Sequence, residues 1–234
     1  MSIPDNIARI RDRIATAAVR AGRDPAGITL MAVSKTFPPE TIHQAYGTGI
    51  RVFGENRVQE FAGKADALKT LNDARWHMIG HLQTNKAAKA AELFNAVDSV
   101  DSLKLAEKLN DAARSHSKTL RILLEVNVGG EAAKTGLPAA SHELEDLLAA
   151  APRLTSLEVR GLMTIPPFTE DLQAARPYFR KLRELRDNIA ARRLPAVRME
   201  TLSMGMSHDF EVAIEEGSTC VRVGTAIFGE RIKA

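Results

Sequence analysis

The chain has 234 residues, of which 44% are hydrophobic and 26% are charged, as in one soluble globular domain spanning residues 1–234. Its net charge of +3 suits an anionic small ligand as well as nucleic acid, and a single cysteine, Cys220, excludes an internal disulfide. Because the N-terminal residues lack a basic segment followed by an apolar run, and no apolar run approaches membrane-spanning length, we expect a cytoplasmic protein that contacts no membrane.

Strand-like segments alternate with helical segments along the chain. The first element is predicted to be an amphipathic helix, because isoleucines and an alanine recur at helical spacing between Ile3 and Ala18, before Gly22. Strands are predicted at 29–33, 51–54, 76–79, 96–100, 120–128, 157–165, 201–203 and 220–223. Helices are predicted at 39–46, 58–71, 86–94, 102–116, 139–150, 172–192 and 209–216, with Ser102 and Ser207 as N-caps of two of them.

Repeated strand–helix units with short connections predict a parallel sheet, and therefore an α/β fold. Eight strands in a chain of this length favour closure into a (β/α)8 barrel, or TIM barrel, over an open doubly wound sheet. Only about ten residues follow the last predicted strand, which is too few for a full eighth outer helix. We therefore expect the extra N-terminal helix to cover that gap.

The stretch 202–231 has the pattern strand, Gly-rich turn, short helix, strand and Gly-Thr. Such a chain can surround a phosphate with backbone N–H groups and hydroxyls. In a (β/α)8 barrel, the loops after strands seven and eight are the usual place for a phosphate site. Arg222, inside the last predicted strand, adds a permanent positive charge nearby. The sequence therefore predicts an anchor for a phosphorylated ligand.

Polar residues recur where the predicted strands end, and Lys35 is the most informative of them. A buried strand that ends in a lysine is unusual, because burial of an ammonium without partners is costly. The alternative is a lysine that extends from the rim into water, but the polar strand end Ser34-Lys35-Thr36 favours a functional role. Lysine amines close to another cation, here Arg222, form Schiff bases with aldehydes. A phosphorylated aldehyde, either pyridoxal phosphate or an aldolase substrate, is the ligand that this combination indicates.

Other charged residues are assigned structural roles. His77 and His81 flank a strand at a spacing too long for one small metal ion, so no metal site is expected. Glu215 and Glu216 are expected to be solvated charges at a helix end. The basic residues of the helix 172–192 are expected to form a solvated outer face, because no interleaved aromatic residues support a nucleic-acid surface.

Six motifs in the chain resemble those of the pyridoxal-phosphate homeostasis proteins, single-domain relatives of the N-terminal barrel of alanine racemase. The motifs are AVSKT at 32–36, FGEN at 53–56, WHMIGHLQTNK at 76–86, GLMTI at 161–165, LSMGMSHD at 202–209 and VRVGTAIFG at 221–229. They occur in the family's order over 28–231, which is nearly the whole chain. The resemblance thus implies a barrel of the alanine racemase N-terminal type.

The resemblance also implies that Lys35 carries pyridoxal 5'-phosphate as a covalent aldimine. The phosphate of this cofactor would be held by the three residues Ser203, Gly224 and Thr225. Arg222 would face the pyridine nitrogen.

Three further positions follow from the same resemblance. Asn56 would line the cofactor pocket, whereas Lys134 matches a family lysine whose role the sequence leaves open. Phe37 is a departure from the family pattern, because members often carry a basic residue two positions after the Schiff-base lysine. A second, weaker binding role for that basic residue is therefore in doubt here.

The resemblance favours a monomeric carrier or homeostasis protein for the cofactor, with no catalytic turnover and with apo forms of pyridoxal-phosphate enzymes as partners. The alternatives are a racemase-like pyridoxal-phosphate enzyme and a cofactor-free Schiff-base aldolase. A protonated Arg222 would leave the pyridine nitrogen unprotonated, which makes the ring a poorer electron sink.

Racemisation would also need a second base on the opposite face of the cofactor. In racemases this base is a tyrosine from a C-terminal domain, which we expect to be absent because the chain stops at Ala234. The tyrosines of this chain, Tyr46 and Tyr178, fall on predicted outer helices, and Ile165 stands where a racemase histidine would align. These features favour the carrier.

Overall fold

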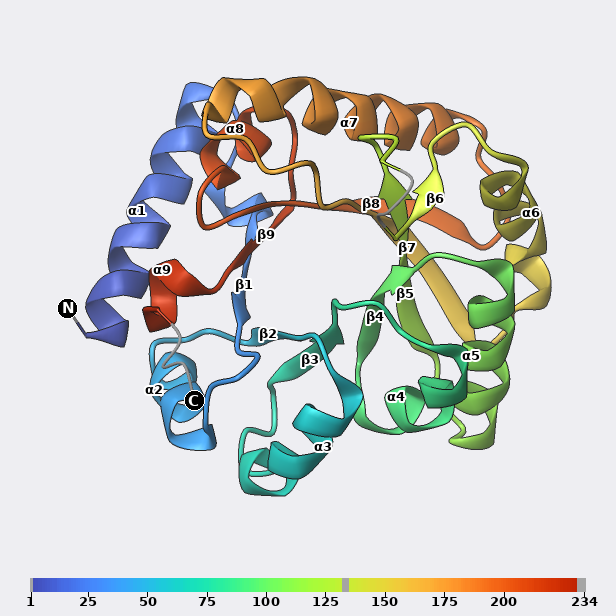
Figure 1. Ribbon diagram of the computed structural model, residues 1–234, viewed down its shortest axis with the longest axis horizontal. Helices are drawn as coiled ribbons and strands as arrows, with labels where there is room; N and C mark the ends of the chain where they lie inside the picture. The colour runs from blue at the N-terminus through green and yellow to red at the C-terminus, as the bar shows by residue number, and fades with distance from the viewer. Residues whose placement is uncertain (1, 132–134, 231–234) are drawn as a thin grey trace.

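The computed structural model describes residues 2–131 and 135–230, and its parallel strands close into a barrel surrounded by helices (Figure 1). The barrel strands are β1 (Thr29–Val33), β2 (Val52–Glu55), β3 (Arg75–Met78), β4 (Ala96–Val100), β5 (Leu120–Asn127), β7 (Leu157–Met163), β8 (Val197–Met206) and β9 (Cys220–Val223). They are ordered β4-β3-β2-β1-β9-β8-β7-β5, and pairing of β4 with β5 completes the circle. The two-residue strand β6 (Leu137–Pro138) pairs with the C-terminal end of β5. The predicted barrel is confirmed.

Helices cover the outside of the barrel. They are α1 (Ile3–Arg20), α2 (Pro39–Gly47), α3 (Val58–Ala65), α4 (Ala87–Leu93), α5 (Leu103–Ser115), α6 (His142–Ala150), α7 (Arg176–Ala191), α8 (Phe210–Glu215) and α9 (Thr225–Phe228). Short 3-10 segments lie at Pro25–Gly27, Asp66–Leu68, Thr84–Lys86, Ala151–Arg153 and Leu172–Ala175. Within the described parts of the chain, none of the helices has both the length and the apolar character needed to cross a bilayer.

Most element boundaries follow the sequence pattern, with informative exceptions. Strands β1, β4 and β9 have the predicted bounds, and the predicted cap Ser102 accepts a hydrogen bond from Leu105 N at 3.3 Å. The seventh barrel strand is much longer than the predicted 201–203, because β8 continues to Met206. The prediction that Ser207 caps the next helix was wrong, because the N-cap of α8 is Asp209.

The N-terminal helix α1 lies beside α8 and α9, where a regular barrel would carry its last outer helix (Figure 1). Ile7, Ile10 and Ile14 lie on its buried face, as the helical spacing predicts. Arg13 on the flank of α1 forms a two-pronged ion pair with Glu211 of α8, at 2.8 and 2.9 Å. The expectation that this helix covers the gap is therefore confirmed.

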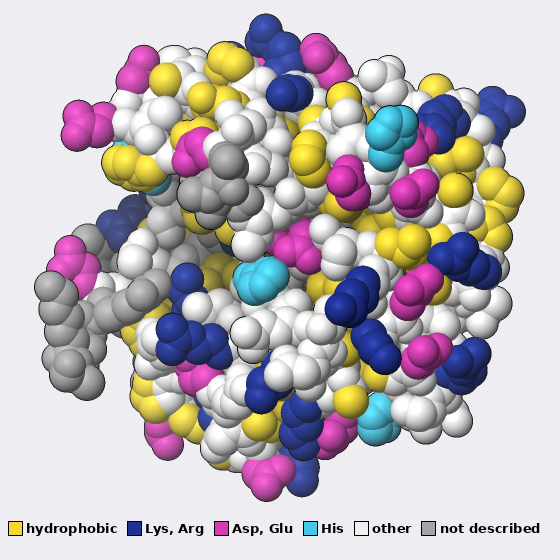
Figure 2. All heavy atoms as spheres, turned by 45° about the vertical axis from the view of Figure 1, so that its right-hand side comes forward, with side chains coloured by type: hydrophobic (Ala, Val, Ile, Leu, Met, Phe, Trp, Pro, Cys, Tyr) yellow, Lys and Arg dark blue, Asp and Glu magenta, His cyan; other side chains and the backbone are white. Residues whose placement is uncertain are grey.

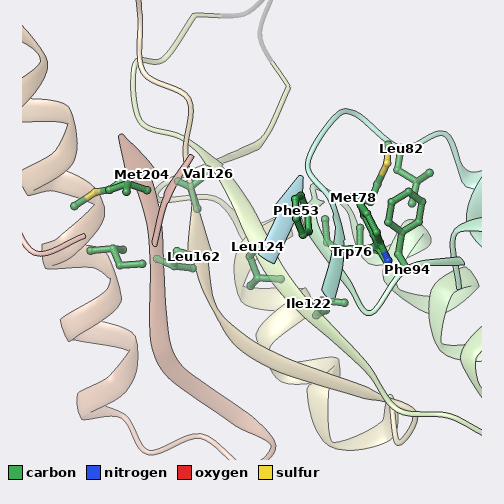
Figure 3. Close-up of a cluster of buried hydrophobic side chains, with 14 of the residues drawn as sticks. Phe53, Trp76, Met78, Leu82, Phe94, Ile122, Leu124, Val126, Leu162 and Met204 are labelled. Atoms are coloured by element: carbon green, nitrogen blue, oxygen red, sulfur yellow. The ribbon is translucent and has the colours of Figure 1, made fainter. Parts of the chain in front are cut away.

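The main hydrophobic core lies between the outer surface of the barrel and the helices (Figure 3). Ile122, Leu124 and Val126 alternate along β5 and belong to this outer core. The intervening positions face the interior of the barrel, which is more polar. There Asp98 is buried against His77, with Nδ1 of the histidine 3.1 Å from its carboxylate. No group of three or more metal-ligating side chains occurs in the described residues.

The prediction that Glu215 and Glu216 are solvated was wrong. Glu216 is only 4% exposed, because the long helix α7 lies over the C-terminal end of α8. Arg176, Arg180 and Arg183 of α7 form ion pairs with its carboxylate at 2.9, 3.1 and 3.3 Å. Part of the basic face of α7 is thus neutralised internally. On the face drawn in Figure 2, basic and acidic side chains are interspersed rather than separated.

Replacing Glu216 with glutamine is expected to reduce the free energy of unfolding at pH 7 by about 1–3 kcal/mol, because charge-assisted hydrogen bonds to three arginines are weakened. Burial raises the pKa of Glu216, but hydrogen bonds from Arg180 and Arg176 outweigh it, so the pKa is lowered. This stabilisation is present above the unfolded pKa of about 4.3 and is lost as the pH falls through the folded pKa. The difference between wild type and Glu216→Gln should therefore shrink below about pH 4.

Urea denaturation of both proteins at pH 7 and at low pH measures this difference. Glu145→Gln is the matched control, because the pair of Glu145 with Arg192 lies at the surface, where ion pairs contribute little. Equal destabilisation by the two substitutions would contradict a special role of the buried carboxylate.

Candidate functional site

A cavity of about 370 Å³ lies at the carboxyl ends of the barrel strands. Its lining comes from the segments that follow β1, β2, β3, β7, β8 and β9 and from the ends of some of these strands. The lining residues are Val33, Lys35, Phe37, Asn56, Ile79, Gly80, Ile165, Met206, Ser207, His208, Arg222, Gly224 and Thr225. Five of the six predicted site residues are therefore brought together, and Ser203 is the exception.

Lys35 reaches the cavity from the turn that follows β1. The strand ends at Val33, and α2 begins only at Pro39, so residues 34–38 form a short connection. Thr36 in this connection has φ = +69°, a left-handed conformation that is rare for a β-branched residue. The side chain of Lys35 is half-buried and lines the cavity. The strand-end lysine is thus part of the concave site rather than of the outer surface.

Arg222 lies at the inner wall of the cavity and is only 3% exposed. Its Nη1 donates to Ser203 O at 2.7 Å and to Ser203 Oγ at 2.8 Å, and its Nη2 donates to Thr164 O at 2.7 Å. Burial lowers the pKa of this guanidinium, and nearby acidic groups, among them Asp98 and Glu125, partly offset that effect. A guanidinium has five N–H groups. Some of the N–H groups of Arg222 therefore make no hydrogen bond to the described residues.

The structure does not bring Ser203 into the cavity. Its side chain is fully buried in β8, where Oγ accepts the hydrogen bond from Arg222. Ser207 occupies the cavity wall instead, and its Oγ accepts from Gly224 N at 3.3 Å and from Ala226 N at 3.5 Å. The hydroxyl expected to cap a helix therefore lies beside the Gly-Thr segment.

Ser207 lies in the cavity wall because β8 extends further than predicted. Gly205 has φ = +91°, and a Cβ atom there would lie 2.6 Å from Ala213 Cβ and 2.9 Å from Phe210 Cα. A glycine at this position lets β8 bend against α8 and continue to Met206, which puts Ser207 at the end of the strand. This glycine, between Met204 and Met206, is the sequence signal that could have identified Ser207.

Asn56 follows β2 and also lines the cavity. Its Oδ1 is buried and has no hydrogen-bond partner within the described residues. Buried polar atoms in folded proteins are almost always paired, so an unpaired amide oxygen on a cavity-lining residue indicates a place for a ligand group. Gly80 is needed beside it, because a Cβ at that position would lie 2.4 Å from Asn56 O.

Ile165 and Phe37 are apolar residues of the cavity lining, and further apolar side chains lie near them. Ile165 is 43% exposed and Phe168 is 79% exposed, both in the segment after β7. The ring of Phe168 packs on that of His208, with centroids 5.5 Å apart, and Phe37 packs on Phe228 at 4.8 Å. Sequence reasoning missed His208, because it follows a strand whose end was placed three residues too early.

Among the described residues, the candidates His81, Tyr46 and Tyr178 do not line the cavity. Lys134 lies outside the described residues. His81 is an exposed residue whose Nδ1 lies 3.1 Å from Asp101 Oδ2. Tyr46 and Tyr178 lie on α2 and α7, as predicted.

Comparison with known proteins shows the family of this chain. Residues 6–232 match the family described as alanine racemase, N-terminal domain. The chain is 47% identical to the pyridoxal phosphate homeostasis protein of Aquifex aeolicus over 99% of both chains. It is 45% identical to the protein of the same name from Pseudomonas aeruginosa, over 98% of this chain and 96% of that one.

The chain belongs to the pyridoxal phosphate homeostasis protein family. The resemblance inferred from the six motifs is thereby confirmed. Among solved structures, PipY from Synechococcus elongatus with pyridoxal phosphate bound is 36% identical, with a TM-score of 0.82, and covers 97% of this chain and 100% of PipY. Alanine racemase from Clostridium difficile is only 14% identical but has a TM-score of 0.71, over 97% of this chain and 57% of that enzyme. This homeostasis family and the racemase therefore share the barrel fold.

Proposed function

We propose that this protein binds pyridoxal 5'-phosphate through a covalent bond to Lys35 and holds the cofactor without catalytic turnover. One observation carries the proposal: the cavity contains a half-buried lysine together with Ser207, Gly224 and Thr225, which offer hydroxyls and backbone N–H groups to a phosphate. Relatives that are named for pyridoxal phosphate homeostasis, and a related structure that holds this cofactor, support it.

The lining of the cavity fits this cofactor. The N–H groups of Gly224 and Ala226 converge on the Ser207 hydroxyl, a geometry that suits phosphate oxygens. The unpaired amide oxygen of Asn56 and the remaining N–H groups of Arg222 can serve polar groups of the ring. A volume of about 370 Å³ lies within the usual range for small-molecule sites.

When bound, pyridoxal phosphate supplies a reactive aldehyde and a ring that withdraws electrons. Lys35 would supply the amine that condenses with the aldehyde carbon, with loss of water. Arg222 stays protonated and would donate towards the ring nitrogen, which keeps that nitrogen unprotonated. The cavity would thus retain the cofactor while limiting its ability to stabilise a carbanion.

An absorbance spectrum of the purified protein, recorded before and after borohydride reduction, tests the proposal. A yellow protein whose visible band disappears on reduction is the expected result. A colourless protein that gains no band on addition of pyridoxal phosphate would overturn the proposal and favour the cofactor-free aldolase.

The isolated protein is expected not to racemise amino acids at an enzymatic rate. Two-base racemisation requires an acid or base on each face of the cofactor. Lys35 can serve one face, but the tyrosines lie outside the cavity, and Ile165 stands just after the relevant strand, β7. Among the described residues that line the cavity, His208 is the titratable side chain besides Lys35 and Arg222, so it is the residue to replace if racemisation is observed.

Incubation with L-alanine and other L-amino acids in deuterated water measures the activity. D-isomers with α-deuterium, formed at turnover rates and lost in Lys35→Ala, would overthrow the carrier proposal. A parallel loss in His208→Ala would then identify the second base.

A further inference from the structure

Lys64 of α3 lies directly behind the turn that carries Lys35. We propose that Lys64 is a positioning residue, which holds residues 34–37 in one conformation and so directs the Lys35 side chain into the cavity. This inference rests on the proposed function, in which the amine of Lys35 reacts with an aldehyde. It concerns a residue that does not itself line the cavity.

The ammonium of Lys64 is fully engaged by this turn and its neighbour strand. Its Nζ donates to Ser34 O at 3.1 Å and to Phe37 O at 3.3 Å, the carbonyls on either side of the Lys35-Thr36 pair. A third contact, at 2.9 Å, reaches Glu55 Oε1. An ammonium has three N–H groups, so these three acceptors use all of them. The side chain is only 9% exposed, which strengthens each contact.

Glu55 couples β2 to the same turn. Its carboxylate is fully buried, and Oε1 also accepts from Ser34 Oγ at 2.5 Å, whereas Oε2 has no partner in the described residues. Burial raises the pKa of Glu55, and the charge of Lys64 and the hydrogen bond from Ser34 oppose that rise. A buried carboxylate of this kind requires the nearby ammonium, so Lys64 and Glu55 act as one unit.

The backbone conformation of Thr36 indicates that contacts with neighbouring residues fix the conformation of the turn. A left-handed β-branched residue persists only when its surroundings determine its conformation. Here Thr36 N donates to Glu60 Oε1 at 2.5 Å, and Glu60 lies 3.6 Å from Lys64 Nζ, one helical turn earlier on α3. Helix α3 therefore binds the turn through one N–H group and two carbonyl groups, and Lys35 projects from between them.

The double variant Lys64→Met/Glu55→Gln tests the proposal. Methionine keeps an unbranched side chain without the charge, and glutamine avoids an unpaired buried carboxylate. Two quantities are measured: the rate of covalent capture of pyridoxal phosphate, and the Kd for pyridoxine 5'-phosphate, in which an alcohol replaces the aldehyde. We expect capture to slow at least tenfold while the Kd changes less than twofold, because the phosphate and ring contacts lie elsewhere in the cavity.

Lys69→Met is the matched control, because the Lys69 side chain is 75% exposed and pairs with Asp66 on the surface of the molecule, so capture should not change. Glu60→Ala is a second variant that leaves Lys64 and Glu55 intact but releases Thr36 N. Glu60→Ala should also slow the capture of pyridoxal phosphate. If thermal unfolding shows that the double variant does not fold, this second variant tests the positioning role alone.

The outcomes separate this inference from the proposed function. If the wild type forms no reducible adduct, the proposed function fails. If the wild type forms the adduct and the folded variants capture the cofactor at the same rate, only the positioning role is overturned. Equal losses of capture and of pyridoxine 5'-phosphate affinity would also overturn it, because they would indicate general damage to the cavity.

Discussion

Replacing Lys35 with alanine is expected to abolish covalent binding of pyridoxal phosphate completely. The substitution removes the amine, and no adduct with the aldehyde can form there. Because the Lys35 side chain is half-buried at the cavity wall and not part of the main core, the fold should survive. The measurement is borohydride reduction of the protein with bound cofactor, followed by proteolysis and mass mapping of the peptides.

In the wild type, the reduced adduct should be found on the peptide that contains Lys35. Lys104→Ala, which removes an exposed lysine of α5, should label as the wild type does. An adduct on Lys134 in the wild type, or undiminished labelling of Lys35→Ala, would refute the assignment.

Replacing Thr225 with glutamate is expected to weaken cofactor binding at least tenfold. The new carboxylate would face the phosphate, and the hydroxyl of Thr225 would be lost. A hydrogen bond to a charged group contributes about 1.5–3 kcal/mol, and about 1.4 kcal/mol corresponds to a tenfold change in Kd. Thr225 is exposed and begins the short helix α9, so the substitution should not disturb the core.

Titration with pyridoxine 5'-phosphate measures this effect without the covalent step. Thr225→Val is the matched control, because it removes the hydroxyl without adding charge, and it should weaken binding less than glutamate does. A Kd for Thr225→Glu equal to that of the wild type would mean that the phosphate binds elsewhere.

The position of the site could be predicted because the barrel topology gathers strand ends at one rim. Lys35 and Thr225 are far apart in the sequence, but β1 and β9 are neighbours in the barrel, so their following residues meet. Two local patterns were therefore enough to predict the position of the site. One is a lysine after an apolar run, and the other is a Gly-Thr pair after a second apolar run. The covalent bond to the cofactor was inferred from the resemblance and stays a prediction.

Beyond Gly205, which signals a bend but not the end of the strand, the choice between Ser203 and Ser207 could not be predicted from local pattern. It depends on where β8 ends, which is set by the contact of Gly205 with α8 and by an irregular register between β8 and β9. The burial of Glu216 likewise depends on how α7 docks, and sequence periodicity gives no information on that docking. The contacts of Lys64 join residues up to 30 positions apart and appear only when α3 is placed against β1.

The placement of α1 has a consequence for synthesis on the ribosome. This helix emerges before the barrel strands, but Glu211, which pairs with Arg13, follows 198 residues later, and β9, which pairs with β1, is later still. Until then the apolar stripe of α1 lacks its contacts with α8 and α9, and the nascent sheet keeps two open edges. Pairing of such distant segments is slow, so the barrel should close only after β9 has been synthesised. The nascent chain is thus most exposed to aggregation, and most dependent on chaperones, in the interval before its last strand is released.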